Sequence, residues 1–198
     1  MRLFIAIDLP AEIKDSLWQQ LAYLRDYLEF ARFVEKENLH LTLAFLGNQP
    51  EKSLNLIKEA IKDTALNFTS QKLVIDKISL GPSELKPRMI WLGFDKASQG
   101  YLESLTNHLR KNLKKAALDF DEKDFSSHIT LARFDNRWQL KFQKKLSLSE
   151  KNREIKRIKE DFSPFKLEFW VEKITLFESN LTPTGPLYKK IFEFELKK

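Results

Sequence analysis

Two short stretches of this chain repeat one pattern: Leu39-His40-Leu41-Thr42-Leu43-Ala44-Phe45 and, 88 residues later, Ser127-His128-Ile129-Thr130-Leu131-Ala132-Arg133. Each alternates apolar and polar residues, which is typical of a strand with one buried face. Because residues i and i+2 share a face, each His/Thr pair points away from the apolar residues that fill the core. The repeat predicts two lobes of like construction that face each other across one groove.

The sequence around these stretches predicts a mixture of strands and helices. A buried strand is expected at residues 2–9, and a helix follows because apolar residues recur at spacings of three and four from Ile13 to Leu28. Further strands are expected at residues 39–46, 72–80, 89–94, 127–134, 165–177 and 187–196, and further helices at 50–61 and 102–113. No Ser-, Gly- or Pro-rich linker divides the chain, so we predict the α+β class and one two-lobed domain over residues 1–198.

Composition excludes several kinds of chemistry. The chain has no cysteine, which removes disulfides, thiol nucleophiles and zinc sites built on cysteine. Its five glycines are never closer than seven residues apart, so no glycine-rich phosphate loop is present. No apolar run approaches the roughly 18 residues that span a bilayer, and the apolar N-terminus meets Asp8 too early for a signal peptide. We therefore expect a cytoplasmic protein.

The duplicated H-x-T pattern suits displacement at phosphorus without a metal ion. One neutral imidazole can remove a proton from water while a protonated imidazole donates to the leaving alkoxide, and histidine supplies both forms near neutral pH. Each threonine hydroxyl can donate to a non-bridging phosphate oxygen. Two facing copies place acid and base on opposite sides of one phosphate. The alternatives are half-buried structural histidines, and threonines chosen as strand formers.

These motifs resemble the two-histidine phosphoesterase superfamily, and within it the RNA 2′,3′-cyclic phosphodiesterases, also called the 2′-5′ RNA ligase family. The resemblance covers nearly the whole chain: residues 1–8, 33–47, 87–93, 125–133, 176–179 and 185–188. It implies a bilobal fold in which two antiparallel sheets form a central groove with helices outside. It also implies hydrolysis of RNA 2′,3′-cyclic phosphate ends to 2′-phosphomonoesters, with no metal and no cofactor.

The resemblance also implies roles for individual residues. His40 and His128 would be the catalytic acid and base, with His40 as the acid for the O3′ leaving group. The phosphate would be held by Thr42, Thr130 and Arg133. Phe45, at the place in the first copy that Arg133 has in the second, would pack on the nucleoside.

Two features depart from the family pattern or complicate it. Ser127 stands where the family often has proline, and the segment between residues 133 and 165 is long and basic. By strict alternation Arg133 would lie on the face opposite His128. The phosphate role of Arg133 therefore requires a bulge or a strand end to redirect it.

Several other residues have a structural and a functional interpretation. Tyr188 is a candidate for contact with substrate in the groove, with a structural role as its alternative, and Phe45 could equally be core. Arg133 could be a surface cation. We interpret His108 as an ordinary surface residue on a helix, and Trp91 and Trp170 as core residues.

The basic character of the chain is concentrated in one segment. Residues 137–159 contain nine Lys and Arg against two Glu, a net charge of +7, while the whole chain has a formal charge of +6. One interpretation is a solvated helix pair whose apolar side chains pack inward: Leu140, Leu146, Leu148, Ile155 and Ile158. The other is a surface that holds an RNA backbone, in which Lys144, Lys145, Lys156 and Arg157 would contact RNA.

The expected partners are RNA with 2′,3′-cyclic phosphate ends, or cyclic nucleotides, bound by a monomer away from membranes. Other substrates share the same four His and Thr residues, among them a 2′,5′-linked oligonucleotide, an ADP-ribose cyclic phosphate, and RNA ends joined in the reverse 2′-5′ ligation. A second class of function is an RNA-binding module without turnover. Salt-sensitive RNA binding with no release of 2′-phosphate would favour it.

Overall fold

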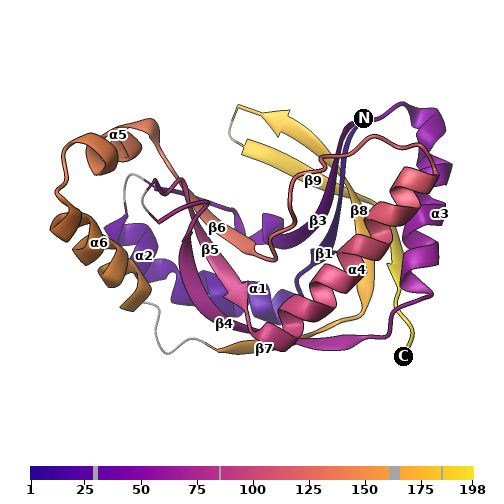
Figure 1. Ribbon diagram of the computed structural model, residues 1–198, viewed down its shortest axis with the longest axis horizontal. Coiled ribbons are helices and arrows are strands. Elements are labelled where there is room, and N and C mark those ends of the chain that lie inside the picture. The colour runs from indigo at the N-terminus through magenta and orange to yellow at the C-terminus, as the bar shows by residue number, and fades with distance from the viewer. Residues whose placement is uncertain (29–30, 85, 161–165, 184) are drawn as a thin grey trace.

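The computed structural model of the chain describes residues 1–28, 31–84, 86–160, 166–183 and 185–198 (Figure 1). The first half contains β1 (Arg2–Asp8), α1 (Ala11–Gln20), α2 (Ala22–Tyr27), β2 (Ala31–Phe33), the 3₁₀ turn η1 (Lys36–Asn38), β3 (His40–Asn48), the 3₁₀ turn η2 (Glu51–Ser53), α3 (Leu54–Ala65), β4 (Gln71–Gly81) and β5 (Met89–Phe94). The second half contains α4 (Lys96–Lys115), β6 (Ile129–Phe134), α5 (Asn136–Lys144), α6 (Leu148–Glu160), β7 (Leu167–Val171), β8 (Lys173–Thr182) and β9 (Gly185–Glu195).

The strands form one curled sheet within the described residues. Its order is β7-β4-β5-β6-β3-β1-β8-β9, with β2 beside β6. The central neighbours β6 and β3 pair antiparallel through the residue pair Leu41 and Ile129. The two antiparallel sheets expected from the resemblance are therefore the two halves of one sheet, and each half contributes one H-x-T strand to the centre.

The two halves are built alike, as the repeat predicted. β1 and β3 are joined through α1 and pair antiparallel. β5 and β6 are joined through α4 and pair in the same way. The last two strands, β8 and β9, return to the half that contains β1 and β3.

Helices cover the outside of the sheet. α3 packs against α4, β8 and β9, while α4 also contacts β3 and β4. α5 and α6 lie at the far end of the molecule from α3 and α4, and α6 contacts β4 (Figure 1). No helix in the described part of the chain is long and apolar enough to cross a membrane.

The apolar faces of the two motif strands lie in the main core, as predicted. Leu41, Leu43, Ile129 and Leu131 are almost completely buried in one large cluster. Burial of such side chains is the main favourable contribution to folding, because it removes apolar surface from water. The opposite face of the central strands is left for the His and Thr residues.

The helix expected from Ile13 to Leu28 is interrupted at Leu21 and forms α1 and α2. Arg25 explains the interruption, since its Nη1 donates a hydrogen bond to the carbonyl oxygen of Trp18 at 2.8 Å. That carbonyl would accept the backbone N–H of Ala22 in a continuous helix. The short strand β2 was not expected, because its three residues have no clear alternation.

Some predictions of burial were wrong. Trp170 is 54% exposed, because its neighbours Phe169 and Val171 point into the core and alternation turns Trp170 outward. Residues 137–159 form the expected helix pair, with Ile155 and Ile158 buried, but Leu140 and Leu148 are exposed. In α5 it is Trp138 and Phe142, one helical turn apart, that are buried, which places Leu140 on the solvent side. The start of the strand expected at 165–177 lies outside the described residues.

Candidate active site

The central pair of strands brings the two motifs together. Leu41 of β3 lies opposite Ile129 of β6 in an antiparallel register. Continuing that register by one residue in each direction sets His40 across from Thr130 and His128 across from Thr42. Both His/Thr pairs therefore belong to the face of the sheet opposite the main core.

A β-bulge in each motif strand redirects the residue that follows it. In β6, Ala132 pairs with Ile90 whereas Thr130 pairs with Trp91, so one extra residue lies in β6 at this point. Leu131 and Ala132 are consecutively buried, and Arg133 is turned outward to the face of His128. The bulge that the phosphate role of Arg133 required is thus confirmed.

The same bulge occurs in the first copy. Ala44 pairs with Ile5 whereas Thr42 pairs with Ala6, and Leu43 and Ala44 are both buried. Phe45 is consequently turned to the His40 face and is 53% exposed. The interpretation of Phe45 as a core residue is therefore wrong.

His40 is held through both ring nitrogens. Its Nδ1 lies 2.7 Å from the carbonyl oxygen of Asn38, an arrangement that fixes the proton on Nδ1, because a carbonyl can only accept. Its Nε2 lies 3.0 Å from Oγ1 of Thr42, and in the neutral ring it accepts the hydroxyl proton. Burial lowers the pKa of His40 to about 4, although donation to the Asn38 carbonyl opposes the change.

An aromatic cluster surrounds His40. Phe4 stacks on Phe177 with ring centroids 5.1 Å apart, and both pack with Tyr188. The ring of His40 lies 5.0 Å from that of Phe4 and 5.3 Å from that of Tyr188, which meets it edge-on. Burial raises the pKa of the Tyr188 hydroxyl, so this group stays a hydrogen-bond donor at neutral pH. The cluster surrounds His40 with aromatic rings on this face of the sheet.

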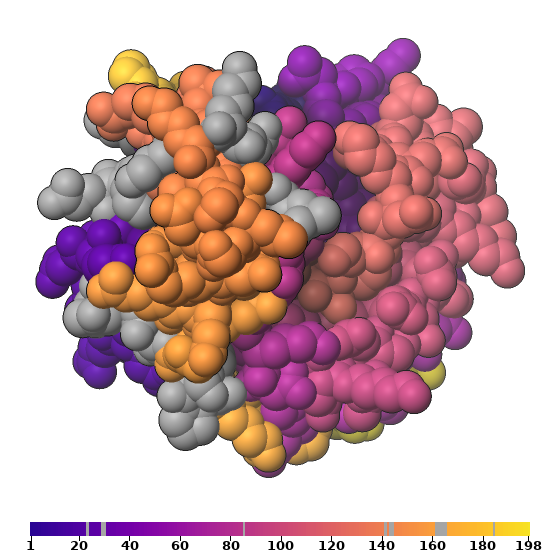
Figure 2. All heavy atoms as spheres, turned by 60° about the vertical axis from the view of Figure 1, so that its left-hand side comes forward, coloured from indigo at the N-terminus to yellow at the C-terminus, as the bar shows by residue number. Residues whose placement is uncertain are grey.

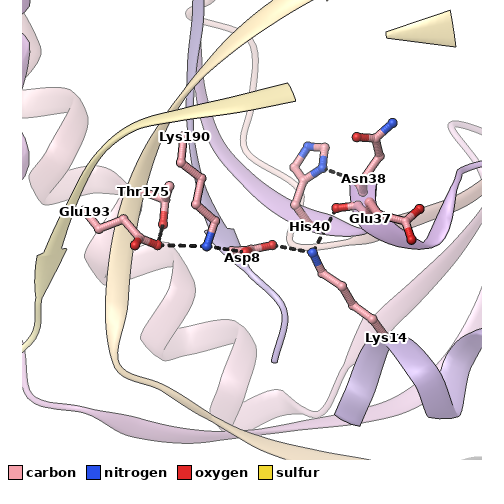
Figure 3. A network of polar contacts seen from close by, with 8 residues as sticks. All are labelled: Asp8, Lys14, Glu37, Asn38, His40, Thr175, Lys190 and Glu193. Carbon is pink, nitrogen blue, oxygen red and sulfur yellow. Dashed lines mark hydrogen bonds and ion pairs between the residues drawn. The ribbon is translucent and has the colours of Figure 1, made fainter. Parts of the chain in front are cut away.

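A network of ion pairs lies behind His40 (Figure 3). The carboxylate of Asp8 binds Nζ of Lys14 at 2.7 Å and Nζ of Lys190 at 2.9 Å. Lys14 also donates to the carbonyl oxygen of Glu37, next to the residue whose carbonyl holds His40. The network therefore fixes the η1 turn that orients the imidazole. The sequence pattern does not predict this network, because Lys14 and Lys190 lie far along the chain from the motif around His40.

His128 has a matching hydrogen bond and a different ring neighbour. Its Nδ1 lies 2.7 Å from the carbonyl oxygen of Ser126, as Nδ1 of His40 does from Asn38. The indole of Trp91 stacks on the imidazole, with centroids 4.0 Å apart and planes 25° apart. Burial lowers the pKa of His128, and the nearby charge of Arg133 lowers it further.

The remaining site residue, Arg133, has an exposed guanidinium, whose Nη1 donates to Sδ of Met89 at 2.9 Å. The structure thus places all seven candidate residues on or beside one face of the central strands. Their individual roles remain predictions. His108, on α4, pairs with Asp63 and stands apart from this set.

Trp91 was interpreted as core and is the main residue that the sequence reasoning missed. Alternation in β5 buries Ile90, Leu92 and Phe94 and puts Trp91 on the other face, beside Thr130. That alternation is visible in the sequence. What the sequence could not show is that β5 pairs with β6 and so brings the indole to His128.

Fold and site together define a class of protein: a two-histidine phosphoesterase, with one H-x-T strand from each half of a duplicated sheet. Family comparison supports this class. The family model described as LigT-like phosphoesterase matches the chain twice, over residues 7–91 and 92–188. The chain therefore belongs to the LigT-like phosphoesterase family.

Individual relatives agree. An RNA 2′,3′-cyclic phosphodiesterase of Thermotoga maritima is 31% identical, with 100% of this chain and 96% of the relative aligned. One of Archaeoglobus fulgidus is 32% identical over 98% of this chain and its own full length. Among solved structures, a Thermus thermophilus protein has a TM-score of 0.74 at 26% identity, and Escherichia coli LigT complexed with 3′-AMP has 0.72 at 25%. Each covers 100% of this chain, with 98% of its own length aligned.

Proposed function

We propose that this chain is a metal-independent RNA 2′,3′-cyclic phosphodiesterase that leaves a 2′-phosphomonoester. The observation that supports it best is the placement of two H-x-T motifs on neighbouring central strands, with matching Nδ1 hydrogen bonds on both histidines. Two relatives that align over almost the whole chain are named RNA 2′,3′-cyclic phosphodiesterases.

In the proposed reaction, water attacks phosphorus and the bond from phosphorus to O3′ breaks. One histidine accepts the proton of the attacking water at Nε2, and the other donates a proton from Nε2 to O3′. Each Nδ1 is already committed to a backbone carbonyl, so Nε2 is the atom free for proton transfer. The protons balance, since one is taken up and one is released per turnover.

The other site residues hold the phosphate and the nucleoside. The hydroxyls of Thr42 and Thr130 donate to non-bridging oxygens, and Thr42 would exchange its contact with His40 for one with phosphate. Arg133 offers two parallel N–H donors to the same oxygens. Phe45, exposed beside the Phe4 ring at 6.1 Å between centroids, offers a surface on which a base can stack.

The partner of this site is RNA with a cyclic phosphate end, bound by a monomer in the cytoplasm. The reverse reaction, 2′-5′ ligation of RNA ends, uses the same residues. E. coli LigT has been crystallised with 3′-AMP and with ATP, which agrees with a groove that accepts nucleotides.

Hydrolysis of a 2′,3′-cyclic mononucleotide tests the catalytic assignment. We expect kcat to fall by several orders of magnitude in His40→Ala and in His128→Ala, with an unchanged circular dichroism spectrum, because each removes one proton carrier. EDTA should leave the rate of the unaltered protein unchanged. His108→Ala is the matched control and should keep full activity. Undiminished turnover in His40→Ala or in His128→Ala would overturn the proposal.

A further inference from the structure

The indole of Trp91 lies against both the backbone of Gly81 and the ring of His128. β5 carries Trp91 between Ser79 of β4 and Thr130 of β6 in the sheet register. One side of the indole stacks on His128 with centroids 4.0 Å apart. A Cβ atom added to Gly81 would lie only 2.4–2.5 Å from the indole carbons Cδ2, Cε2 and Cε3.

Gly81 is therefore required by close approach and not by its backbone conformation, since its φ is not positive. Any side chain at this position would clash with the indole that stacks on His128. Within the part of the chain that the structure describes, the indole of Trp91 is held by packing and not by a hydrogen bond. Nε1 of Trp91 is buried and has no hydrogen-bond partner among the described residues, so its neighbours alone hold the ring.

The two halves of the site differ at this point. His40 meets Phe4 at 42° and Tyr188 at 88°, so these aromatic contacts of its ring are tilted or edge-on. His128 is stacked at 25° on Trp91. The face of an indole carries negative charge density, which attracts a cation placed over it.

We propose that Trp91, seated on Gly81, is a positioning residue for His128: its stacked indole fixes the imidazole plane for proton transfer and stabilises the protonated ring. The proposal rests on the phosphodiesterase function proposed above. It does not depend on which histidine is the acid, because His128 carries a proton either before or after transfer in both assignments.

Burial of His128 and the charge of Arg133 on β6 both oppose protonation of the His128 ring. The imidazole of His40 on β3 also interacts with His128, but there the charge of His128 lowers the pKa of His40. The stack with Trp91 offsets part of the cost of burying a cationic His128 beside Arg133. Replacing Trp91 should therefore change a property of His128 itself, and not only the stability of the fold.

Titration of His128 by NMR, read against Trp91→Leu and Trp91→Phe, tests this directly. We expect the pKa of His128 to fall by about half a unit to one unit in Trp91→Leu, and to be largely restored in Trp91→Phe. Trp170→Leu, at an exposed tryptophan of β7, should leave it unchanged. An unaltered His128 pKa in a folded Trp91→Leu protein would overturn the proposal. This titration needs no substrate, so it is separate from failure of the proposed function.

Kinetics on a cyclic mononucleotide give the second readout. Trp91→Leu should lower kcat about tenfold to a hundredfold, with KM changed much less, because the loss is in proton transfer rather than in binding. The alkaline limb of its pH–rate profile should move to lower pH by the same amount as the NMR pKa. A rise in KM alone would contradict a positioning role.

A double-mutant cycle with Gly81→Ala tests whether the contact between Gly81 and the indole of Trp91 matters for catalysis. Gly81→Ala should lower kcat in the unaltered background and have little further effect in Trp91→Ala, since the clash is then gone. Gly93→Ala on β5 is the matched control, because the three atoms nearest to its added Cβ, at 2.8–3.3 Å, belong to the side chain of Lys77 and not to the indole. Equal effects of Gly81→Ala in both backgrounds would show that it does not act through Trp91.

Discussion

At the scale of residues, each of the two histidines makes the same kind of hydrogen bond through Nδ1, but the two rings have different neighbours. Each Nδ1 faces the carbonyl oxygen of the residue two positions earlier, Asn38 or Ser126. The same local backbone geometry therefore occurs in both copies of the motif. In each copy it leaves Nε2 as the nitrogen for proton transfer. Burial lowers both pKa values, that of His40 to about 4.

These pKa values predict the pH dependence of kcat/KM. The reaction needs one histidine neutral and the other protonated, and the free protein is richest in this form between the two pKa values. Both lie below 6.5, so kcat/KM should fall about tenfold per pH unit above that pH. A bound phosphate anion favours the protonated rings, so the kcat profile should lie at higher pH. A kcat/KM that still increases at pH 8 would contradict the account.

The same burial predicts a loss of stability in mild acid. The unfolded chain protonates His40 near pH 6.5, whereas the folded protein does so only near pH 4. The free energy of unfolding should therefore fall as the pH drops from 6.5 to 4, by about 3 kcal/mol from this group. Urea denaturation across this range should show a smaller loss in His40→Gln. Equal losses in both proteins would contradict the buried, neutral state of His40.

At the scale of elements, the bulged strands β3 and β6 were the most predictable part of the site. Their alternation located both strands and both His/Thr pairs. The bulge was predicted only indirectly, from the demand that Arg133 share a face with His128. The sequence could not predict the interruption at Leu21 or the stacking of Trp91. Each depends on a contact made in three dimensions, by Arg25 and by His128.

The helices α5 and α6 carry the basic segment, and Figure 2 shows the atoms of α6 in orange on the face turned toward the viewer. Part of their charge is paired, since Arg137 binds Asp135, Lys156 binds Glu160 and Lys159 binds Glu84. Arg153, Lys156 and Arg157 are nevertheless exposed along α6 and give this helix a positive outer surface next to β4.

Neutralising that surface should separate long substrates from short ones. Replacing Arg153, Lys156 and Arg157 by glutamine should weaken binding of long RNA and flatten its salt dependence, because fewer counterions are released. Hydrolysis of a cyclic mononucleotide should be unchanged. The matched control makes the same charge change on α3 and α4, at the opposite end of the molecule from α6 (Figure 1), at three exposed lysines: Lys62, Lys111 and Lys115. If long RNA binds both variants with equal affinity, α6 is only a solvated helix.

At the scale of the whole molecule, duplication and the strand order of the sheet explain why the site lies where it does. Neither half is a continuous piece of chain, since β8 and β9 complete the half that contains β1 and β3, and β2 pairs with β6 in the other half. β9 thereby brings Tyr188 to His40, and β8 brings Phe177 to Phe4. The two histidines lie on one face of neighbouring strands because the two halves join at Leu41 and Ile129. The charge of the whole molecule is equally uneven, because residues 137–159 account for more than its net +6.

The central claim is that the paired histidines open a 2′,3′-cyclic phosphate by expelling O3′. The most direct test is incubation of the protein with an oligoribonucleotide that ends in a 2′,3′-cyclic phosphate, followed by separation of the 2′-phosphate and 3′-phosphate products. We predict a 2′-phosphate end, formed equally with and without EDTA and absent with His128→Ala. A 3′-phosphate product would contradict the assigned leaving group, and binding without any product would contradict catalysis itself.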